Sequence, residues 1–209
     1  MLDTLFIPAA NPDSRRLMVV LHGLGDSLNS YRTFPAEIRL PWLNYLLVNA
    51  PNSYVLSFSW FDFPGDPTPG AERSYRALEQ LLDTQRERGF PTEQTVLFGF
   101  SQGCLMVWET GVRYPHRFAG CIGVSGFMRE PRQLLAARSP VAAEQRFCIT
   151  HGMLDELLPI ETSRKQVEQM RSAGLQVEWK EIVKGHTIEP FGEMLLLRRF
   201  IERFFSQTS

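Results

Sequence analysis

The pentapeptide Gly99-Phe100-Ser101-Gln102-Gly103 places a serine between two glycines, directly after an apolar run. This Gly-x-Ser-x-Gly pattern is typical of a serine nucleophile on a sharp strand-to-helix turn, because the glycines permit the strained backbone and the close packing. The pattern also occurs by chance, with the serine as an ordinary turn residue. It therefore predicts a nucleophile only where a strand precedes Ser101 and a helix follows it.

The segments on both sides of Ser101 have the required patterns. Residues 95–98, TVLF, form a short apolar run that begins with β-branched residues, which predicts a buried strand. Residues 102–114 predict a helix that ends before Pro115. Ser101 is thus predicted to lie at the helix N-terminus, where negative charge is favoured.

A serine hydroxyl is a poor nucleophile at neutral pH, so the hypothesis requires a histidine base and a carboxylate that orients it. The sequence has 4 histidines. His186 lies on a loop between an alternating strand pattern and the last helical segment, and is the best candidate for the base. His22 and His151 directly follow apolar strand runs, and His116 is more simply a surface residue in the turn after the nucleophile helix.

The acid is expected between Ser101 and His186, on a loop that follows a strand. The segment HGMLDELLP supplies Asp155 in such a position. Glu156 and Glu161 stay open as alternatives, and Asp155 itself also suits a solvated helix start. Position favours Asp155.

An acyl-transfer intermediate carries a negative oxygen that needs two preorganised backbone donors. The N–H of Gln102, directly after the nucleophile, is predicted to be one of them, and Leu24 in the loop LHGLGDS is predicted to be the other. In the same loop, His22 is expected to fix the backbone by hydrogen bonding. Asp26 is expected to tie the loop rather than to take part in catalysis.

The remaining segments supply the elements that must position these residues. Further strand patterns and helical patterns alternate along the chain, with strands at 17–21, 45–48, 121–124, 147–150 and 175–183, and helices at 71–88, 160–173 and 193–205. The Pro- and Gly-rich stretch 63–70 predicts an exposed loop. The alternation predicts an α/β fold with a mostly parallel sheet flanked by helices, and such sheets form sites at the carboxyl ends of their strands.

Composition narrows the class of protein further. The chain has 209 residues, 44% hydrophobic and 22% charged, which suits one well-filled domain over residues 1–209. A net charge of -1 gives no overall attraction to nucleic acid. No apolar run approaches the roughly 20 residues of a membrane-spanning helix, and the first residues do not have the pattern of a secretory signal, so we expect them to be mature sequence. Cys104, Cys121 and Cys148 lie in apolar contexts, which predicts reduced thiols in a cytoplasmic protein.

Six segments, HGLGDS, SWFDF, GFSQG, GVSGF, HGMLDELLP and KGHTIE, together resemble the phospholipase/carboxylesterase family of α/β-hydrolases, which includes the acyl-protein thioesterases. The resemblance spans nearly the whole chain and implies a single-domain α/β-hydrolase fold. It implies a catalytic triad in the chain order Ser101, Asp155 and His186, with backbone donors at Leu24 and Gln102 and with no metal or organic cofactor. It also implies hydrolysis of carboxylic esters, and in some members of long-chain thioesters or lysophospholipids.

The family pattern places the apolar loop SYVLSFSWFDF beside an acyl-binding groove. Trp60, Phe61 and Phe127 are therefore candidates for substrate contact, although aromatic residues equally suit the core. Cys104 after the nucleophile turn and Thr187 after the base depart from many relatives, which leaves the acyl-chain length open. The expected partner is a small-molecule ester, a lipid ester or an acylated protein, and the chain is expected to be a monomer or a homodimer.

Two other interpretations stay open. In the first, the protein is a hydrolase fold that has lost its catalytic machinery and binds a ligand. Such decay usually removes a triad member or an oxyanion glycine, and here each part has a candidate. Another hydrolase activity, peptidase-like or dienelactone-hydrolase-like, uses the same scaffold. The latter typically has cysteine where this chain has Ser101.

Overall fold

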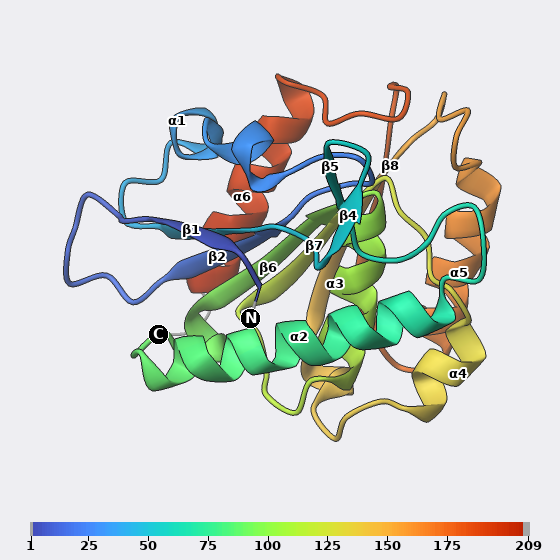
Figure 1. The fold of residues 1–209 in the computed structure, drawn as a ribbon, viewed down its shortest axis with the longest axis horizontal. Helices are drawn as coiled ribbons and strands as arrows, with labels where there is room; N and C mark the ends of the chain where they lie inside the picture. Colours follow the sequence, from blue (N-terminus) through green and yellow to red (C-terminus); the bar gives the residue numbers. More distant parts are fainter. Residues whose placement is uncertain (1, 207–209) are drawn as a thin grey trace.

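Short runs of apolar residues form the central sheet, because helices cover both of its faces and leave the inner strands no polar side. The structure is a computed structural model that describes residues 2–206 (Figure 1). The seven strands pair in the order β1-β3-β2-β6-β7-β8-β9, and every pair is parallel except β1 with β3. They are β1 (Thr4–Ile7), β2 (Leu17–Leu21), β3 (Asn44–Val48), β6 (Thr95–Phe100), β7 (Gly120–Val124), β8 (Arg146–Gly152) and β9 (Gln176–Ile182).

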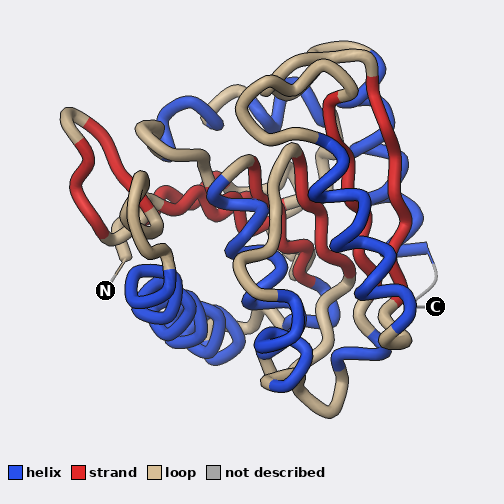
Figure 2. The backbone as a smooth tube through the Cα atoms, turned by 90° about the vertical axis from the view of Figure 1, so that its right-hand side faces the viewer, coloured by secondary structure: helices blue, strands red, loops and turns tan. Residues whose placement is uncertain are grey.

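Helices form a layer on each face of this sheet (Figure 2). They are α1 (Phe34–Ile38), α2 (Thr68–Glu87), α3 (Gln102–Arg113), α4 (Pro131–Ala136), α5 (Ile160–Ser172) and α6 (Gly192–Ser206). Neighbouring residues on β6 point to opposite faces, so Leu97 joins the apolar core beneath α2, α3 and α5 while Phe98 joins the core beneath α1 and α6. The sheet thus separates two hydrophobic cores and holds the strand ends in fixed register.

The predicted α/β architecture and the predicted parallel strands are confirmed. The exposed loop predicted over 63–70 is wrong at its end, because α2 begins at Thr68. Pro69 lies in the first turn of this helix, where a missing N–H is tolerated, and Asp66 accepts a hydrogen bond from the Thr68 N–H at 2.9 Å. The segment predicted as an apolar loop contains a hairpin of β4 (Asn52–Tyr54) and β5 (Ser57–Ser59).

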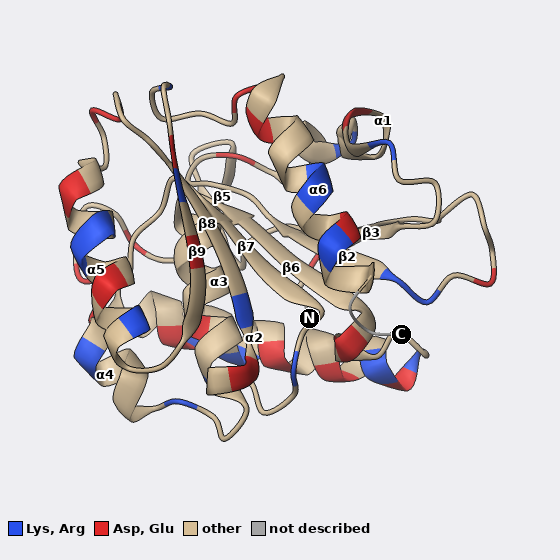
Figure 3. Cartoon of the chain, turned by 180° about the vertical axis from the view of Figure 1, so that it is seen from behind, with Lys and Arg blue, Asp and Glu red and all other residues tan. Residues whose placement is uncertain are grey.

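Charged residues of both signs are interspersed along α2, α5 and α6, whereas the inner strands carry few of them (Figure 3). Within the described residues, no helix is both long and apolar enough to cross a membrane. Strands from both ends of the chain pair in the same sheet, and the single domain over residues 1–209 stays a prediction.

Candidate active site

Ser101 lies at the turn between β6 and α3, with a backbone φ of 54° and ψ of -114°. A positive φ is strained for a residue with a side chain, and the surrounding packing must hold it in place. The two flanking glycines make the turn possible: a Cβ on Gly99 would lie 2.1 Å from the Gly103 carbonyl oxygen, and one on Gly103 would lie 2.2 Å from the Leu21 carbonyl oxygen. This is the geometry predicted for a nucleophile turn.

Three side chains from separate loops form one hydrogen-bonded chain at the carboxyl end of the sheet. The Nε2 atom of His186 lies 2.9 Å from the Ser101 Oγ, and its Nδ1 lies 2.8 Å from the Asp155 Oδ2. An ionised carboxylate only accepts hydrogen bonds, so Nδ1 carries the imidazole proton and Nε2 is left to accept the Ser101 proton. Sequence order and loop position had predicted this meeting of the three residues.

Asp155 is held in place by the backbone that follows it. Its Oδ1 accepts hydrogen bonds from the N–H groups of Leu157 at 3.1 Å and Leu158 at 2.9 Å, which leaves Oδ2 for His186. The carboxylate is buried, whereas Glu156 and Glu161 are exposed. The structure therefore brings Asp155, and neither of the alternative acids, to the histidine.

His151 lies next to the Asp155 carboxylate but is not part of the hydrogen-bonded chain of Asp155, His186 and Ser101. Its Nε2 lies 2.8 Å from the carbonyl oxygen of Leu158 and 3.6 Å from the Asp155 Oδ2. Burial lowers the pKa of His151, so the ring is neutral near pH 7 and donates from Nε2 to Leu158. His151 thus packs against the acid loop.

The two predicted oxyanion donors line the same pocket as Ser101. In the part of the chain that the structure describes, neither the Leu24 nor the Gln102 backbone N–H donates a hydrogen bond. The Gln102 side chain is engaged elsewhere, since its Oε1 accepts from the Trp60 N–H at 2.9 Å and its Nε2 donates to the Phe61 carbonyl at 3.0 Å. Donation of these two N–H groups to an anionic oxygen stays a prediction.

His22 and Asp26 fix the loop that carries Leu24, as predicted. The Nε2 of His22 accepts from the Ala50 N–H at 3.0 Å, so its Nδ1 is the donor to the Gly23 carbonyl at 2.6 Å. Asp26 accepts from the Ser27 N–H at 2.7 Å. Burial lowers the pKa of His22, which keeps the ring neutral in this role.

The two buried neutral histidines, His22 and His151, predict that the folded protein is less stable in acid. Because burial lowers the pKa of His22 and of His151 in the folded state, the unfolded chain takes up protons first as pH falls below about 6.5. We expect the melting temperature to fall as pH is lowered from about 7 to about 5, and the His22→Gln variant to show a shallower fall. Calorimetry across this range checks the prediction, and a melting temperature independent of pH would contradict it.

A largely apolar pocket of about 320 Å³ opens beside Ser101 and His186. Its other lining residues are Gly23, Leu24, Asp26, Phe61, Phe63, Phe100, Gln102, Phe127, Leu157 and Leu158. Phe61 and Phe127 thus line it, as expected of substrate-contact candidates. Leu157, two residues after Asp155, was missed in the sequence, because the letters DELLP do not show that this leucine is exposed.

Trp60 is not among the residues that line this pocket, which corrects its assignment as a substrate contact. Its side chain is completely buried, and its indole Nε1 donates to the His22 carbonyl at 2.9 Å. Trp60 therefore joins the β4-β5 hairpin to the loop that carries Leu24. Its interpretation as a core aromatic is the one that fits.

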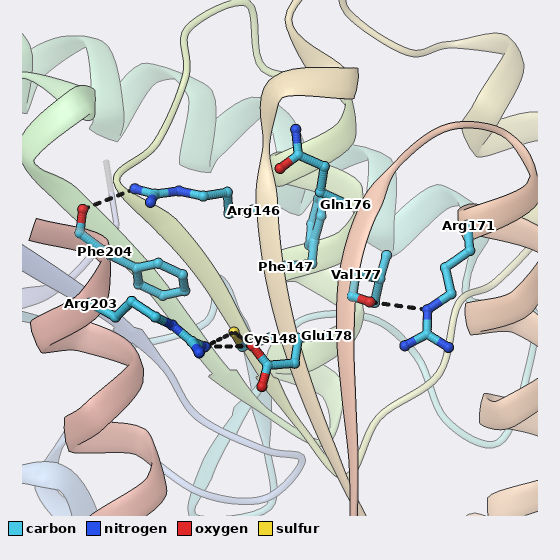
Figure 4. Close-up of a pocket in the computed structure, with 9 residues that line it drawn as sticks. All are labelled: Arg146, Phe147, Cys148, Arg171, Gln176, Val177, Glu178, Arg203 and Phe204. Carbon is cyan, nitrogen blue, oxygen red and sulfur yellow. Dashed lines mark hydrogen bonds and ion pairs between the residues drawn. The ribbon is translucent and has the colours of Figure 1, made fainter. Parts of the chain in front are cut away.

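A second pocket, of about 430 Å³, is lined by residues at the amino ends of β8 and β9 and near the end of α6 (Figure 4). Its arginines bind protein acceptors: Arg146 donates to the Phe204 carbonyl at 2.9 Å, and Arg203 donates to Glu178 at 2.5 Å. None of the predicted site residues lines it. Among the described residues, no three metal-ligating side chains are placed to hold a metal ion.

Comparison with known proteins identifies the family to which this arrangement belongs. Residues 2–204 match the phospholipase/carboxylesterase family. The chain belongs to this family. It is accordingly an enzyme with the α/β-hydrolase fold, a serine hydrolase of the carboxylesterase type.

Relatives and solved structures agree with the family assignment. Acyl-protein thioesterase 1 of Schizosaccharomyces pombe is 31% identical over 159 residues, which cover 68% of this chain and 69% of the relative. The crystal structure of esterase PE8 superposes with a TM-score of 0.85 at 26% identity, covering 97% of this chain and 99% of that chain. A probable inactive carboxylesterase of Oryza sativa is 24% identical over 212 residues, which cover 92% of this chain and 86% of that relative.

Proposed function

We propose that this protein hydrolyses carboxylic esters through an acyl-enzyme on Ser101, with His186 as the general base and Asp155 as the group that orients it. The observation that carries the proposal is the hydrogen-bonded chain from Asp155 through His186 to Ser101 at the mouth of an apolar pocket. Nucleophile, base and orienting acid within hydrogen-bond reach are the signature of an activated serine.

In the first step, the Ser101 Oγ attacks the ester carbonyl carbon while His186 Nε2 takes its proton. The carbonyl oxygen becomes negative and is stabilised by the N–H groups of Leu24 and Gln102. Asp155 stabilises the imidazolium that forms, and its two hydrogen bonds from the backbone hold the carboxylate in place. His186 then gives the proton to the departing alcohol or thiol, and the carbonyl forms again as an acyl-serine.

In the second step, the same residues act on water. His186 takes a proton from a water molecule, which attacks the acyl carbonyl, and the proton then passes to the Ser101 Oγ as the acid is released. The oxyanion donors serve both steps because both intermediates place their negative oxygen at the same site.

The apolar lining of the pocket supports the proposal that the protein recognises the acyl chain of its substrate. Its wall carries Phe63, Phe127 and Leu157, which offer apolar surface to a hydrocarbon chain, while Phe61 is completely buried. Within this class we propose a small-molecule ester or a lipid ester, with a thioester on an acylated protein as the narrower alternative. That alternative draws support from the relative named acyl-protein thioesterase 1.

We further propose a cytoplasmic protein that acts as a monomer or homodimer, without a cofactor or a nucleic-acid partner. Cys104, Cys121 and Cys148 are buried free thiols, which suits a reducing compartment. Burial raises the pKa of Cys104 to about 12, so this thiol beside the nucleophile turn stays protonated and inert.

Hydrolysis of chromogenic esters, from acetate to long acyl chains, tests the proposed activity and its pocket together. We expect Phe127→Ala to lower kcat/KM for a long-chain ester about tenfold and to change that for acetate little, because only a long chain reaches this ring. Phe90→Ala is the matched control, since Phe90 is a half-buried aromatic that packs on Phe6 and does not line the pocket. Equal losses at every chain length would contradict the assignment of Phe127.

The same series separates the enzyme from a decayed hydrolase fold. A relative named as a probable inactive carboxylesterase makes that comparison necessary. Wild-type turnover of some ester that depends on Ser101 supports the proposal. No turnover of any ester would favour a ligand-binding protein.

A further inference from the structure

A buried ion pair that the proposed mechanism does not use lies behind the triad. The Nζ atom of Lys184 is 2.7 Å from both carboxylate oxygens of Glu193, and the two side chains are 2% and 0% exposed. Burial alone lowers the pKa of Lys184, and the Glu193 carboxylate opposes this shift. A buried pair of this kind is weak evidence for stability, because desolvation offsets much of the attraction. Its position therefore needs another explanation.

Lys184 contacts the backbone beside both the base and the acid. Its Nζ donates to the carbonyl of Thr187 at 2.7 Å, directly after His186. Its own carbonyl oxygen accepts from the Leu154 N–H at 3.0 Å, directly before Asp155. One residue thus joins the two loops whose side chains must stay 2.8 Å apart at the triad.

Glu193 anchors this lysine to regular structure. Its Oε1 accepts from the Thr150 hydroxyl at 2.6 Å, on the strand that leads to Asp155. At the start of α6, Glu193 accepts from the Glu189 N–H at 2.8 Å and donates its own N–H to the Glu189 carboxylate at 2.9 Å. This reciprocal pair resembles a capping box and fixes the end of the His186 turn.

The turn itself is irregular, although local contacts such as the hydrogen bond from the Thr187 N–H to the Gly185 carbonyl at 3.0 Å also support it. Residues 183–191 lie in neither a helix nor a strand, yet they carry the general base. The chain passes close to β8 here: a Cβ on Gly152 would lie 2.5 Å from the Lys184 carbonyl oxygen. A displacement of about 1 Å in such a turn is enough to cost about a hundredfold in rate.

We propose that Lys184, held by Glu193, is a positioning residue that keeps the His186 imidazole in line between Asp155 and Ser101. The inference rests on the proposed triad and names a residue outside it that holds it in place. The ammonium touches no reacting atom and acts through the Thr187 carbonyl.

The first test is Lys184→Met, which keeps the length of the side chain and removes the ammonium. With a short-chain ester we expect kcat to fall about 10- to 100-fold and KM to change less than about threefold, because the base is misplaced while the pocket is intact. Arg113→Met is the matched control. It breaks a pair with the buried Glu109 at 3.0 Å on the last turn of α3, the end opposite Ser101, and should retain kcat.

The double variant Lys184→Met/Glu193→Gln separates positioning from stability. Lys184→Met alone leaves a buried carboxylate without its partner, so its melting temperature should fall. The double variant removes that charge, and we expect the melting temperature to recover while kcat stays low, because the hydrogen bond to Thr187 is still missing. Recovery of kcat together with the melting temperature would overturn the proposal.

A spectroscopic readout needs no turnover. The His186 Nδ1–H that donates to Asp155 should give a far-downfield proton resonance in the wild type, and Lys184→Met should weaken it or move it upfield. An unchanged resonance would overturn the positioning role. Because this resonance is independent of turnover, it decides the role of Lys184 even where the wild type hydrolyses no ester, an outcome that would count against the proposed function.

Discussion

Replacing Ser101 with alanine is expected to lower kcat for ester hydrolysis about a million-fold, which corresponds to about 8 kcal/mol of transition-state stabilisation. In the proposed mechanism, the variant removes the atom that forms the acyl bond. The fold should survive, because the Ser101 backbone keeps its hydrogen bond to the Val124 carbonyl and the smaller side chain fits the same turn. Steady-state kinetics on a short-chain ester, with a melting curve on the same preparation, checks the prediction.

Controls on the other two residues test whether the three side chains act as a unit. His186→Ala should cost about as much as Ser101→Ala, and the double variant should be little worse than either, because one missing member disables the others. Asp155→Asn should cost about 10⁴-fold, since an amide favours the wrong imidazole tautomer. Losses of kcat that add up in the double variant would contradict the mechanism, and so would turnover by Ser101→Ala at the wild-type rate.

The second large effect concerns folding. Gly103→Ala is expected to destabilise the protein by about 4 kcal/mol or more, because the new Cβ would lie 2.2 Å from the Leu21 carbonyl oxygen. That oxygen belongs to the rigid backbone of β2, so α3 must move away from the sheet. Denaturant unfolding measures the loss.

Gly89→Ala is the matched control for this prediction. Gly89 has a φ of 88°, and an added Cβ there would have no neighbour within 4 Å. The variant should be destabilised only by the backbone penalty of roughly 1–2 kcal/mol. Equal losses in the two variants would show that conformational freedom, and not the close approach of helix to strand, explains Gly103.

The central strands could be predicted because continuous apolar runs such as 17–21 and 95–98 have few alternatives in an α/β chain. The edge strand β1 was missed, since it has four residues and alternates between exposed and half-buried positions. The β4-β5 hairpin was missed for a related reason: each strand has three residues, and no periodicity can be read over so short a run.

The candidate site, like the fold, could be predicted from the sequence only in part. Chain order and strand ends placed Ser101, Asp155 and His186 together, because the carboxyl ends of parallel strands meet at one edge of a sheet. Residue type alone could not tell that Trp60 lies in the core while Phe127 lines the pocket, since that depends on tertiary packing. The Lys184–Glu193 pair carries no sequence signal, because two charged residues in a loop and a first helical turn are ordinarily exposed.

Trapping the acyl-enzyme tests the central claim most directly. The wild-type protein is mixed with an excess of an activated ester, quenched in acid within the first turnovers and analysed by intact mass and peptide mapping. We predict one acyl group for each chain, on the peptide that contains Ser101, and none in Ser101→Ala. An acyl group on another residue, or turnover with no adduct at Ser101, would contradict the account.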